Sequence, residues 1–261
     1  MDRVEKPSEN GEEPRRLWFE SVQGMVDGER VLAGSEAVFF PARHEVFVRF
    51  WGPEAAEPER YDVPPEITET GELLIWLARQ DVSVPRGRLR EALEKAGLSE
   101  ERFLLTQEAK HMGFQLREAS LTPALTKALI RLSAAWEAEG SCRGYRKNTA
   151  ADIEGNRIFL LEKGSKILGY LFGHVEPSKN SNSVMPEGTP CFEVEELYVR
   201  PKLRSRGYGG MLFQYTEECV RKEAAYMMVS TATKDWQAIL NFYLKEQGMQ
   251  FWSARLFKKL D

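Results

Sequence analysis

The first fifty or so residues alternate apolar and polar positions in short runs, which is the pattern of a small antiparallel β-sheet. Glycine or proline separates the runs, as expected for turns between strands. The predicted strands cover residues 17–22, 30–32, 37–40 and 45–51. Residues 52–65, which hold four prolines and several acids, are predicted to form a loop. Helical spacing then predicts helices over residues 68–80, 85–96 and 99–112.

The pattern changes after residue 113, where strands and helices follow one another. The predicted strands cover residues 114–119, 157–162, 167–176, 192–199, 226–231 and 250–257. The predicted helices cover residues 122–139, 210–224 and 234–247. Two polar stretches, 140–155 and 177–190, are predicted loops. This order predicts an α+β fold with a mixed β-sheet flanked by helices.

Charge is divided unevenly along the chain, which favours two modules over one. Residues 1–111 carry 15 Lys and Arg against 23 Asp and Glu, a net charge of −8, whereas residues 112–261 carry 21 against 17, a net charge of +4. We predict a disordered lead-in over residues 1–16, a small α+β accessory domain over 17–111, and a larger domain over 112–261. A charge of +4 suits an anionic cofactor but is too small to argue for nucleic acid.

Cysteine, histidine and hydropathy patterns exclude several classes of protein. The three cysteines and three histidines lack metal-ligand spacing, so we expect no metal site. An odd number of cysteines fits a reducing compartment, and no apolar run reaches the ~20 residues of a membrane span. The charged N-terminus is unlike a signal peptide. These observations predict a cytoplasmic protein without membrane contact.

The most informative motif is an acid-bearing strand followed by a glycine-rich turn and a helix. The strand carries Glu193, Glu195 and Glu196, and the turn reads Arg204-Ser205-Arg206-Gly207-Tyr208-Gly209-Gly210. Such a turn directs several backbone N–H groups and the positive end of a helix dipole at one point. A pyrophosphate can bind there.

Residues 112–261 resemble the GNAT superfamily of N-acetyltransferases. The resemblance rests on the Arg-x-x-Gly-x-Gly spacing, on its place between an acidic strand and a helix, and on Phe242-Tyr243 in the last predicted helix. The resemblance implies acetyl-CoA as cosubstrate and no metal. It also implies that the N–H groups of the turn hold the CoA pyrophosphate, that the first arginine supplies charge, and that the strand runs beside the pantetheine arm. The implied cofactor-binding residues are Leu197, Tyr198, Val199, Arg204, Ser205, Arg206, Gly207, Tyr208, Gly209 and Gly210.

A carboxylate is the expected general base, because a typical amine is protonated near pH 7. The resemblance ranks Glu193 first, with Glu196 second. Strand alternation places Glu196 on the face of Tyr198, and Glu193 with Glu195 and Leu197 on the other, unless a β-bulge resets the phase. Solvated acids at a strand end are the alternative interpretation.

Tyr243 is the general acid that the resemblance implies for the departing CoA thiolate. A core aromatic is the alternative, because Tyr243 follows Trp236 and Leu240 at helical spacing. This helix departs from the family pattern, since Trp236 stands where an asparagine is common and Gly248 comes one residue later than usual.

Loops around the cleft are expected to select the substrate. Residues 140–155 hold the candidate substrate-binding residues Tyr145, Asp152 and Glu154, whose acids suit a cationic amine. We therefore predict an acetyl-CoA-dependent N-acetyltransferase that acts on a primary amine, of a small molecule or a protein, by direct transfer in a ternary complex. The alternatives are a non-catalytic acyl-CoA-binding protein and a DNA-binding regulator, since residues 89–99 resemble the turn of a helix-turn-helix. Nucleic acid is the less favoured partner, and a homodimer stays open.

Overall fold

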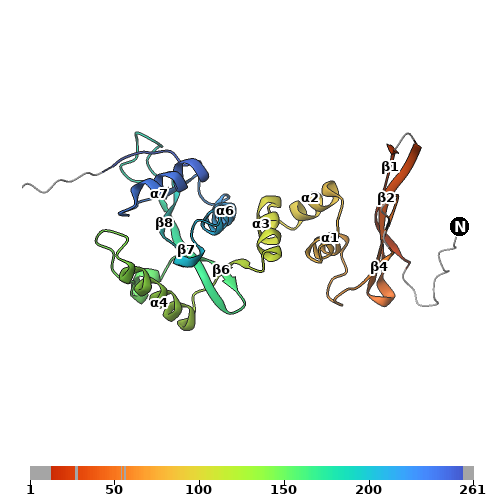
Figure 1. Ribbon diagram of the computed structural model, residues 1–261, viewed down its shortest axis with the longest axis horizontal. Helices are drawn as coiled ribbons and strands as arrows, with labels where there is room; N and C mark the ends of the chain where they lie inside the picture. The colour runs from red at the N-terminus through yellow and green to blue at the C-terminus, as the bar shows by residue number, and fades with distance from the viewer. Residues whose placement is uncertain (1–12, 27–28, 54, 56, 255–261) are drawn as a thin grey trace, which may run out of the picture. The chain divides into compact units, whose positions relative to one another are not determined.

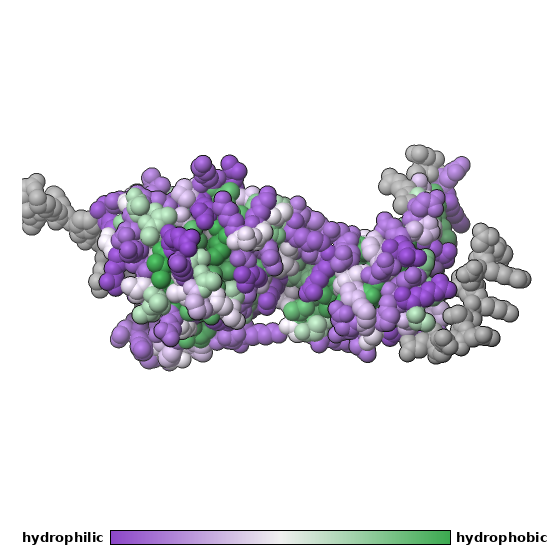
Figure 2. All heavy atoms as spheres, turned by 90° about the horizontal axis from the view of Figure 1, so that it is seen from below, coloured by the Kyte–Doolittle hydropathy of each residue, from purple (hydrophilic) through white to green (hydrophobic). Residues whose placement is uncertain are grey.

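The computed structural model describes residues 13–26, 29–53, 55 and 57–254 (Figure 1). The chain separates into two compact units, Met1–Glu100 and Glu101–Asp261. No helix in these described ranges is long and apolar enough to cross a membrane. Hydrophilic side chains cover much of the surface that is visible in Figure 2.

The first unit contains a four-stranded antiparallel sheet with the strand order β1-β2-β3-β4. Its strands are β1 Arg15–Val26, β2 Glu29–Phe40, β3 Glu45–Trp51 and β4 Glu59–Asp62, with the 3₁₀ turn η1 Pro41–Arg43 between β2 and β3. The antiparallel sheet that the sequence predicts is confirmed.

The second strand differs from the prediction, because the runs 30–32 and 37–40 are parts of one strand that continues through Gly34. A Cβ added at Gly34 would lie 2.1 Å from the carbonyl oxygen of Glu20 in β1 and 2.6 Å from a ring carbon of Trp51 in β3. The glycine therefore makes room for an aromatic ring on the sheet and does not end the strand.

The fourth strand, β4, lies within residues 52–65, so the prediction of a loop there is wrong. Tyr61 of β4 pairs with Val46 of β3, and its ring centroid lies 6.5 Å from that of Trp76. These contacts hold a short edge strand to the sheet, although the surrounding prolines and acids conceal it in the sequence.

Two helices of the first unit, α1 Thr70–Arg79 and α2 Arg86–Lys95, lie close to their predicted ranges. Helical spacing brings Leu73, Leu77 and Leu93 into the core, where each is almost fully buried. At the surface, Arg86 and Arg90 of α2 both pair with Glu100, at 2.9 and 2.8 Å.

The second unit is built on a five-stranded sheet with the order β5-β6-β7-β8-β9, in which β5 to β8 are antiparallel and β9 is parallel to β8. The strands are β5 Gln115–Ala119, β6 Arg157–Lys163, β7 Lys166–Pro177, β8 Pro190–Val199 and β9 Tyr226–Val229. The helices are α3 Glu100–His111, α4 Pro123–Glu139, α5 Ala150–Ile153, α6 Tyr208–Val220 and α7 Trp236–Leu240, with the 3₁₀ turn η2 Pro201–Leu203 and the π-helical turn η3 Asn241–Glu246. This architecture confirms the predicted α+β fold with a mixed sheet.

Each face of this sheet packs against its own hydrophobic cluster. On the first face, Phe159 and Phe192 pack with Phe213 of α6. On the opposite face, Tyr170 and Tyr198 pack in a cluster with helix α4. We call these the α6 face and the α4 face of the sheet.

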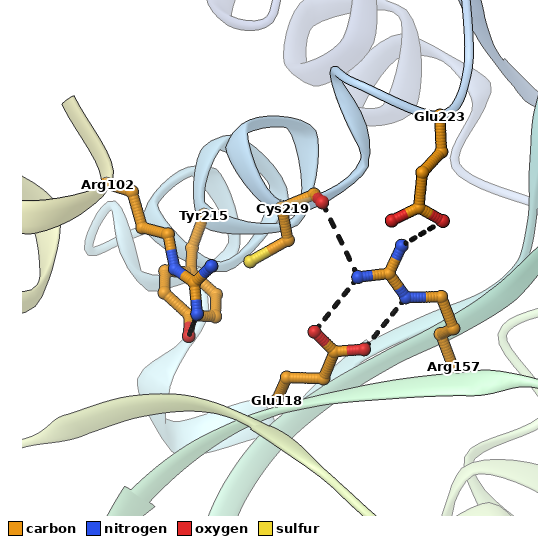
Figure 3. A network of polar contacts seen from close by, with 6 residues as sticks. All are labelled: Arg102, Glu118, Arg157, Tyr215, Cys219 and Glu223. Atoms are coloured by element: carbon orange, nitrogen blue, oxygen red, sulfur yellow. Dashed lines mark hydrogen bonds and ion pairs between the residues drawn. The ribbon is translucent and has the colours of Figure 1, made fainter. Parts of the chain in front are cut away.

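Helix α3 packs within the second unit, because Ala109 is buried in the α6-face cluster. Arg102 of α3 donates to the phenol oxygen of Tyr215 on α6 at 3.3 Å, and its guanidinium lies 5.3 Å from the centre of that ring (Figure 3). The division between compact units falls after Glu100, the first residue of α3, whereas the predicted domain boundary lies between residues 111 and 112.

A polar network joins the C-terminal end of α6 to strands β5 and β6 (Figure 3). Arg157 of β6 donates two hydrogen bonds to Glu118 of β5, at 2.8 and 2.9 Å. It also lies 3.0 Å from the carboxylate of Glu223 and donates to the carbonyl of Cys219 at 3.4 Å. The network fixes one end of the helix whose other end carries the glycine-rich turn.

The last elements are shorter than predicted. The helix predicted over residues 234–247 consists of α7 and the π-helical turn η3. The strand predicted over 226–231 ends at Val229. Residues 250–254 form no strand, and the remainder of the strand predicted over 250–257 lies outside the described residues.

Candidate active site

The glycine-rich turn lies between η2 and the start of α6. Ser205 and Gly207 have φ angles of 57° and 82°, and these left-handed conformations reverse the chain into the helix. The first helical acceptor is the Gly207 carbonyl, which receives the N–H of Met211 at 3.0 Å. The N–H groups before Met211 therefore have no intrahelical partner and lie at the positive end of the helix dipole. This arrangement fits a pyrophosphate.

The two glycines that follow serve close packing of α6 on the last helix. A Cβ added at Gly209 would lie 3.4 Å from a ring carbon of Phe242, and one at Gly210 would lie 3.1 Å from Nε2 of Gln247. The side-chain positions of Gly209 and Gly210 therefore face protein, and only their backbone N–H groups suit the predicted role.

Arg204 is tied to the protein and does not point freely into the turn. Its Nε donates to the carbonyl of Val199 at 2.8 Å, and its Nη1 lies 2.8 Å from Glu139. The guanidinium also lies 5.4 Å from the ring centre of Tyr198. Much of the charge that was expected to face the pyrophosphate is thus balanced by Glu139.

Strands β8 and β9 pair only along part of their length. Cys191 to Val194 pair with Tyr226 to Val229, and β9 then ends. From Glu195 to Val199, β8 has no β9 partner within the described residues. The predicted residues Leu197, Tyr198 and Val199 lie on this open edge, which runs toward the glycine-rich turn. Backbone groups there that β7 does not pair are available to a bound molecule, apart from the Val199 carbonyl, which accepts from Arg204.

A β-bulge in β8 decides which way the acids point. Phe172 of β7 pairs with Glu196, whereas Gly173 pairs with Val194, so Glu195 is the extra residue. A Cβ at Gly173 would lie 2.1 Å from the carbonyl oxygen of Glu193, which only glycine avoids.

The bulge overturns the expected alternation of β8. Glu193 pairs with His174 and Glu196 pairs with Phe172, two positions apart on β7, so both acids lie on the α4 face. Leu197 belongs to the cluster on the α6 face. The prediction that Glu193 and Leu197 share a face is wrong, because the bulge resets the phase.

Glu196 is a buried carboxylate held by two phenols. Its Oε1 accepts from Tyr145 and its Oε2 accepts from Tyr170, both at 2.8 Å, and only 8% of the residue is exposed. Burial raises the pKa of Glu196 above its usual range, and the two phenol hydrogen bonds offset part of that rise. Glu196 thus combines high proton affinity with a fixed orientation.

Glu193 is half-buried and faces a cluster of like charges. Burial raises the pKa of its carboxyl, and the charges of Glu195 and Glu176 raise it further, while His174 opposes them. His174 has its Nδ1 3.7 Å from Glu195 and its Nε2 3.9 Å from Glu176. Glu193 therefore also has the proton affinity of a general base.

A pocket of about 600 Å³ opens on the α4 face beside these acids. The ionisable residues of its lining are Arg146, Asp152, Glu154, His174, Glu195 and Glu196. Four carboxyl groups against one arginine make the pocket suited to a cation. Within the described ranges, this pocket included, no group of three or more His, Cys, Asp or Glu residues is arranged to hold a metal ion.

The predicted substrate-binding residues have different positions around this pocket. Asp152 and Glu154 line it, whereas Tyr145 lies behind Glu196 as a hydrogen-bond donor. The Oδ2 of Asp152 also accepts from the N–H and the hydroxyl of Thr149, both at 2.7 Å, which caps helix α5. Part of the role of Asp152 is therefore structural.

Tyr243 lies in the π-helical turn η3, on the α6 face. Its ring centroid is 4.9 Å from that of Phe242 and 5.9 Å from that of Phe213. Burial raises the pKa of Tyr243 to about 12. Its phenol therefore carries a proton at neutral pH, as a general acid requires, and its packing is equally that of a core aromatic.

Tyr170 and His174 belong to the site but were not singled out in the sequence. They lie with Phe172 at alternate positions of β7, so one face of this strand presents all three. That spacing was the available signal. Their meeting with Glu196 and Glu195 depends on a pairing between strands that the local pattern does not reveal.

Residues 126–249 match the family model described as the acetyltransferase (GNAT) family. No curated protein matches the chain. The match spans the sheet from β6 to β9, the glycine-rich turn and η3.

Several solved structures are similar to this chain at low sequence identity. One is an aminoglycoside acetyltransferase from an uncultured soil metagenomic sample, with 17% identity and a TM-score of 0.43 over 57% of this chain and 98% of the other. Another is an acetyltransferase of Trypanosoma brucei, with 17% identity and a TM-score of 0.40 over 56% and 100%. A third is AAC(6')-Iy with a bisubstrate analogue, with 13% identity and a TM-score of 0.39 over 57% and 98%. From the family match, residues 126–249 of this chain form a domain of the GNAT acetyltransferase family.

Proposed function

We propose that this protein is an acetyl-CoA-dependent N-acetyltransferase that acts on a primary amine of a small cationic molecule, by direct transfer in a ternary complex. The observation that carries the proposal is the acid-lined pocket beside the segment of β8 that β9 leaves unpaired. An amine in the pocket and a thioester along the strand edge would meet at the bulge. Holding both reactants there removes much of the entropic cost of their encounter.

The residues of the turn and of β8 fit the cosubstrate. N–H groups of residues 206–210 would bind the pyrophosphate, with the exposed Arg206 adding charge. Backbone groups of Leu197 to Val199 would lie beside the pantetheine arm. Bound acetyl-CoA supplies the acetyl group as a reactive thioester.

The carboxylates of the α4 face would prepare the amine. Glu196 lines the pocket, and Glu193 does not, so the geometry favours Glu196 as the group that takes the ammonium proton. Glu193, the cross-strand partner of His174, stays the second candidate. The neutral nitrogen then forms the C–N bond as the C–S bond breaks, and Tyr243 donates its proton to sulfur. The nitrogen and Glu196 release their protons to solvent, and the Tyr243 phenolate regains one from solvent.

Two rival functions make different use of these features. A non-catalytic acyl-CoA binder is favoured by Trp236, which stands where an asparagine is common, and by the π-helical turn that carries Tyr243. A DNA-binding role is disfavoured because Arg86 and Arg90 are both engaged by Glu100.

The test is a thiol-release assay with acetyl-CoA and a panel of mono- and polyamines, on the full chain and two variant pairs. Arg206→Glu should weaken acetyl-CoA binding, whereas Lys222→Glu, near the other end of α6, should not. Glu196→Gln should reduce turnover at least tenfold, whereas Glu187→Gln in the loop 177–190 should not. Binding of acetyl-CoA with no acetylation of any amine would favour the non-catalytic binder.

A further inference from the structure

The Glu196 carboxylate is held from two independent parts of the fold. Tyr170 comes from the neighbouring strand β7, is fully buried, and stacks on Phe172 with ring centroids 5.8 Å apart. Tyr145 comes from the segment between α4 and α5, and its ring lies 4.4 Å from that of Trp136. Packing fixes both phenols, so their O–H groups fix both carboxylate oxygens.

The two hydrogen bonds leave part of the carboxylate available. An ionised carboxylate offers about four acceptor positions, and the phenols take one on each oxygen. Glu196 lines the pocket, so its remaining positions can serve a ligand there. The side-chain amide of Asn148, which lines the same pocket, is a third donor beside Glu196 and also lowers the pKa of that carboxyl.

The surroundings of Glu196 explain why donors are needed. The groups that act on its charge are Tyr170 from β7, Tyr145 and Asn148 from the segment before α5, and Asp152 from α5. The other ionisable residues of the pocket lining are Arg146, Glu154, His174 and Glu195. Asp152 and burial both disfavour the anion. Without the phenols, a buried carboxyl beside another acid would hold its proton and could not accept one from an amine.

We propose that Tyr145 and Tyr170 are positioning residues that hold the Glu196 carboxylate ionised and aimed into the pocket, where it accepts the N–H of the substrate ammonium group. The assignment rests on the proposed function. It differs from the role expected for Tyr145, which was direct contact with the substrate. It also gives a role to Tyr170, whose phenol is buried away from solvent.

The consequence for pH has a definite sign. Phenol donors stabilise the anion and lower the pKa of Glu196, so removing one raises that pKa. The acidic limb of the pH profile of kcat/KM should therefore move to higher pH, by about one unit for each phenol removed. A merely structural tyrosine would change stability or the height of the profile and leave the limb in place.

The experiment compares Tyr170→Phe and Tyr145→Phe with Tyr215→Phe, which removes the hydroxyl that Arg102 contacts on the α6 face. Two readouts are taken on the full chain: the pH profile of kcat/KM, and the ¹³C-NMR titration of the Glu196 carboxyl, assigned by its loss in Glu196→Gln. We expect both midpoints to rise in the first two variants and to stay unchanged in Tyr215→Phe. If Tyr170→Phe does not fold, the half-buried Tyr145 supplies the test alone.

The proposal would be overturned if the NMR titration midpoint of the Glu196 carboxyl were unchanged in both Tyr170→Phe and Tyr145→Phe. It would also be overturned if that midpoint shifted equally in Tyr215→Phe. The NMR readout needs no activity. A shifted carboxyl titration in a protein that acetylates no amine would therefore leave the positioning of Glu196 intact and refute the transferase function instead.

Discussion

The guanidinium of Arg157 gives the sharpest test of how α6 is held in place. Replacing Arg157 with alanine removes the paired hydrogen bonds to Glu118, the ion pair with Glu223 and the bond to the Cys219 carbonyl (Figure 3). The Arg157 side chain is 23% exposed, so these interactions are only partly screened by water.

The size of the effect follows from these contacts. A partly buried, paired hydrogen bond between charged groups contributes about 2 kcal/mol, and the remaining contacts with the lost packing on Phe159 add about 1 kcal/mol. A loss of about 3 kcal/mol in a unit of this size lowers the midpoint of thermal unfolding by roughly 6–12 °C. Arg221→Ala, which removes an exposed pair with Glu217 and a contact with the largely buried carboxylate of Glu218, should cost less, about 1–2 kcal/mol.

Scanning calorimetry of Arg157→Ala, Glu118→Gln, their double variant and Arg221→Ala checks this reasoning. The double variant should be less destabilised than the sum of the two single variants, because the two residues share one interaction. Equal midpoints for Arg157→Ala and the unaltered protein, or additive effects in the double variant, would show that the network does not hold α6.

Three further predictions follow from the site. Gly173→Ala should cost about 2–3 kcal/mol in urea unfolding and reduce acetylation, since its Cβ would meet the Glu193 carbonyl and disturb the bulge; wild-type stability would contradict the assigned geometry. The pKa values of Glu193 and Glu196 are raised in the folded protein, so their contribution to the free energy of unfolding is complete below the unfolded pKa of 4.5 and is lost as pH rises through the folded pKa values. Glu196→Gln should therefore make the free energy of unfolding depend less on pH, in unfolding curves measured from pH 4 upward. Tyr243→Phe should reduce kcat and leave acetyl-CoA affinity in calorimetry nearly unchanged, whereas unaltered kinetics at neutral pH would leave Tyr243 as a core aromatic.

The elements and the glycine-rich turn could be predicted because their signals are local. Apolar spacing located the sheet strands of the second unit. The turn needs only a few adjacent residues that are small or that can take a left-handed backbone conformation. The same local reasoning divided β2 at Gly34, because the sequence does not show that Trp51, in the next strand, needs the space.

The arrangement of the acids could not be predicted because it depends on contacts between distant residues. The bulge at Glu195 is imposed across the sheet by Gly173, and nothing in the run Glu193 to Glu196 marks it. Tyr145 and Tyr170 reach Glu196 from 51 and 26 residues away. Likewise, the charge of Arg204 is balanced by Glu139, which lies at the end of α4.

The most direct test of the central claim is a calorimetric titration of the full chain with acetyl-CoA, with desulfo-CoA as a comparison ligand. We predict saturable binding of one acetyl-CoA per chain in the micromolar range, and weaker binding in Arg206→Glu. The absence of binding by a folded protein would contradict the assignment of the glycine-rich turn as the cosubstrate site, and with it the proposed acetyltransferase activity.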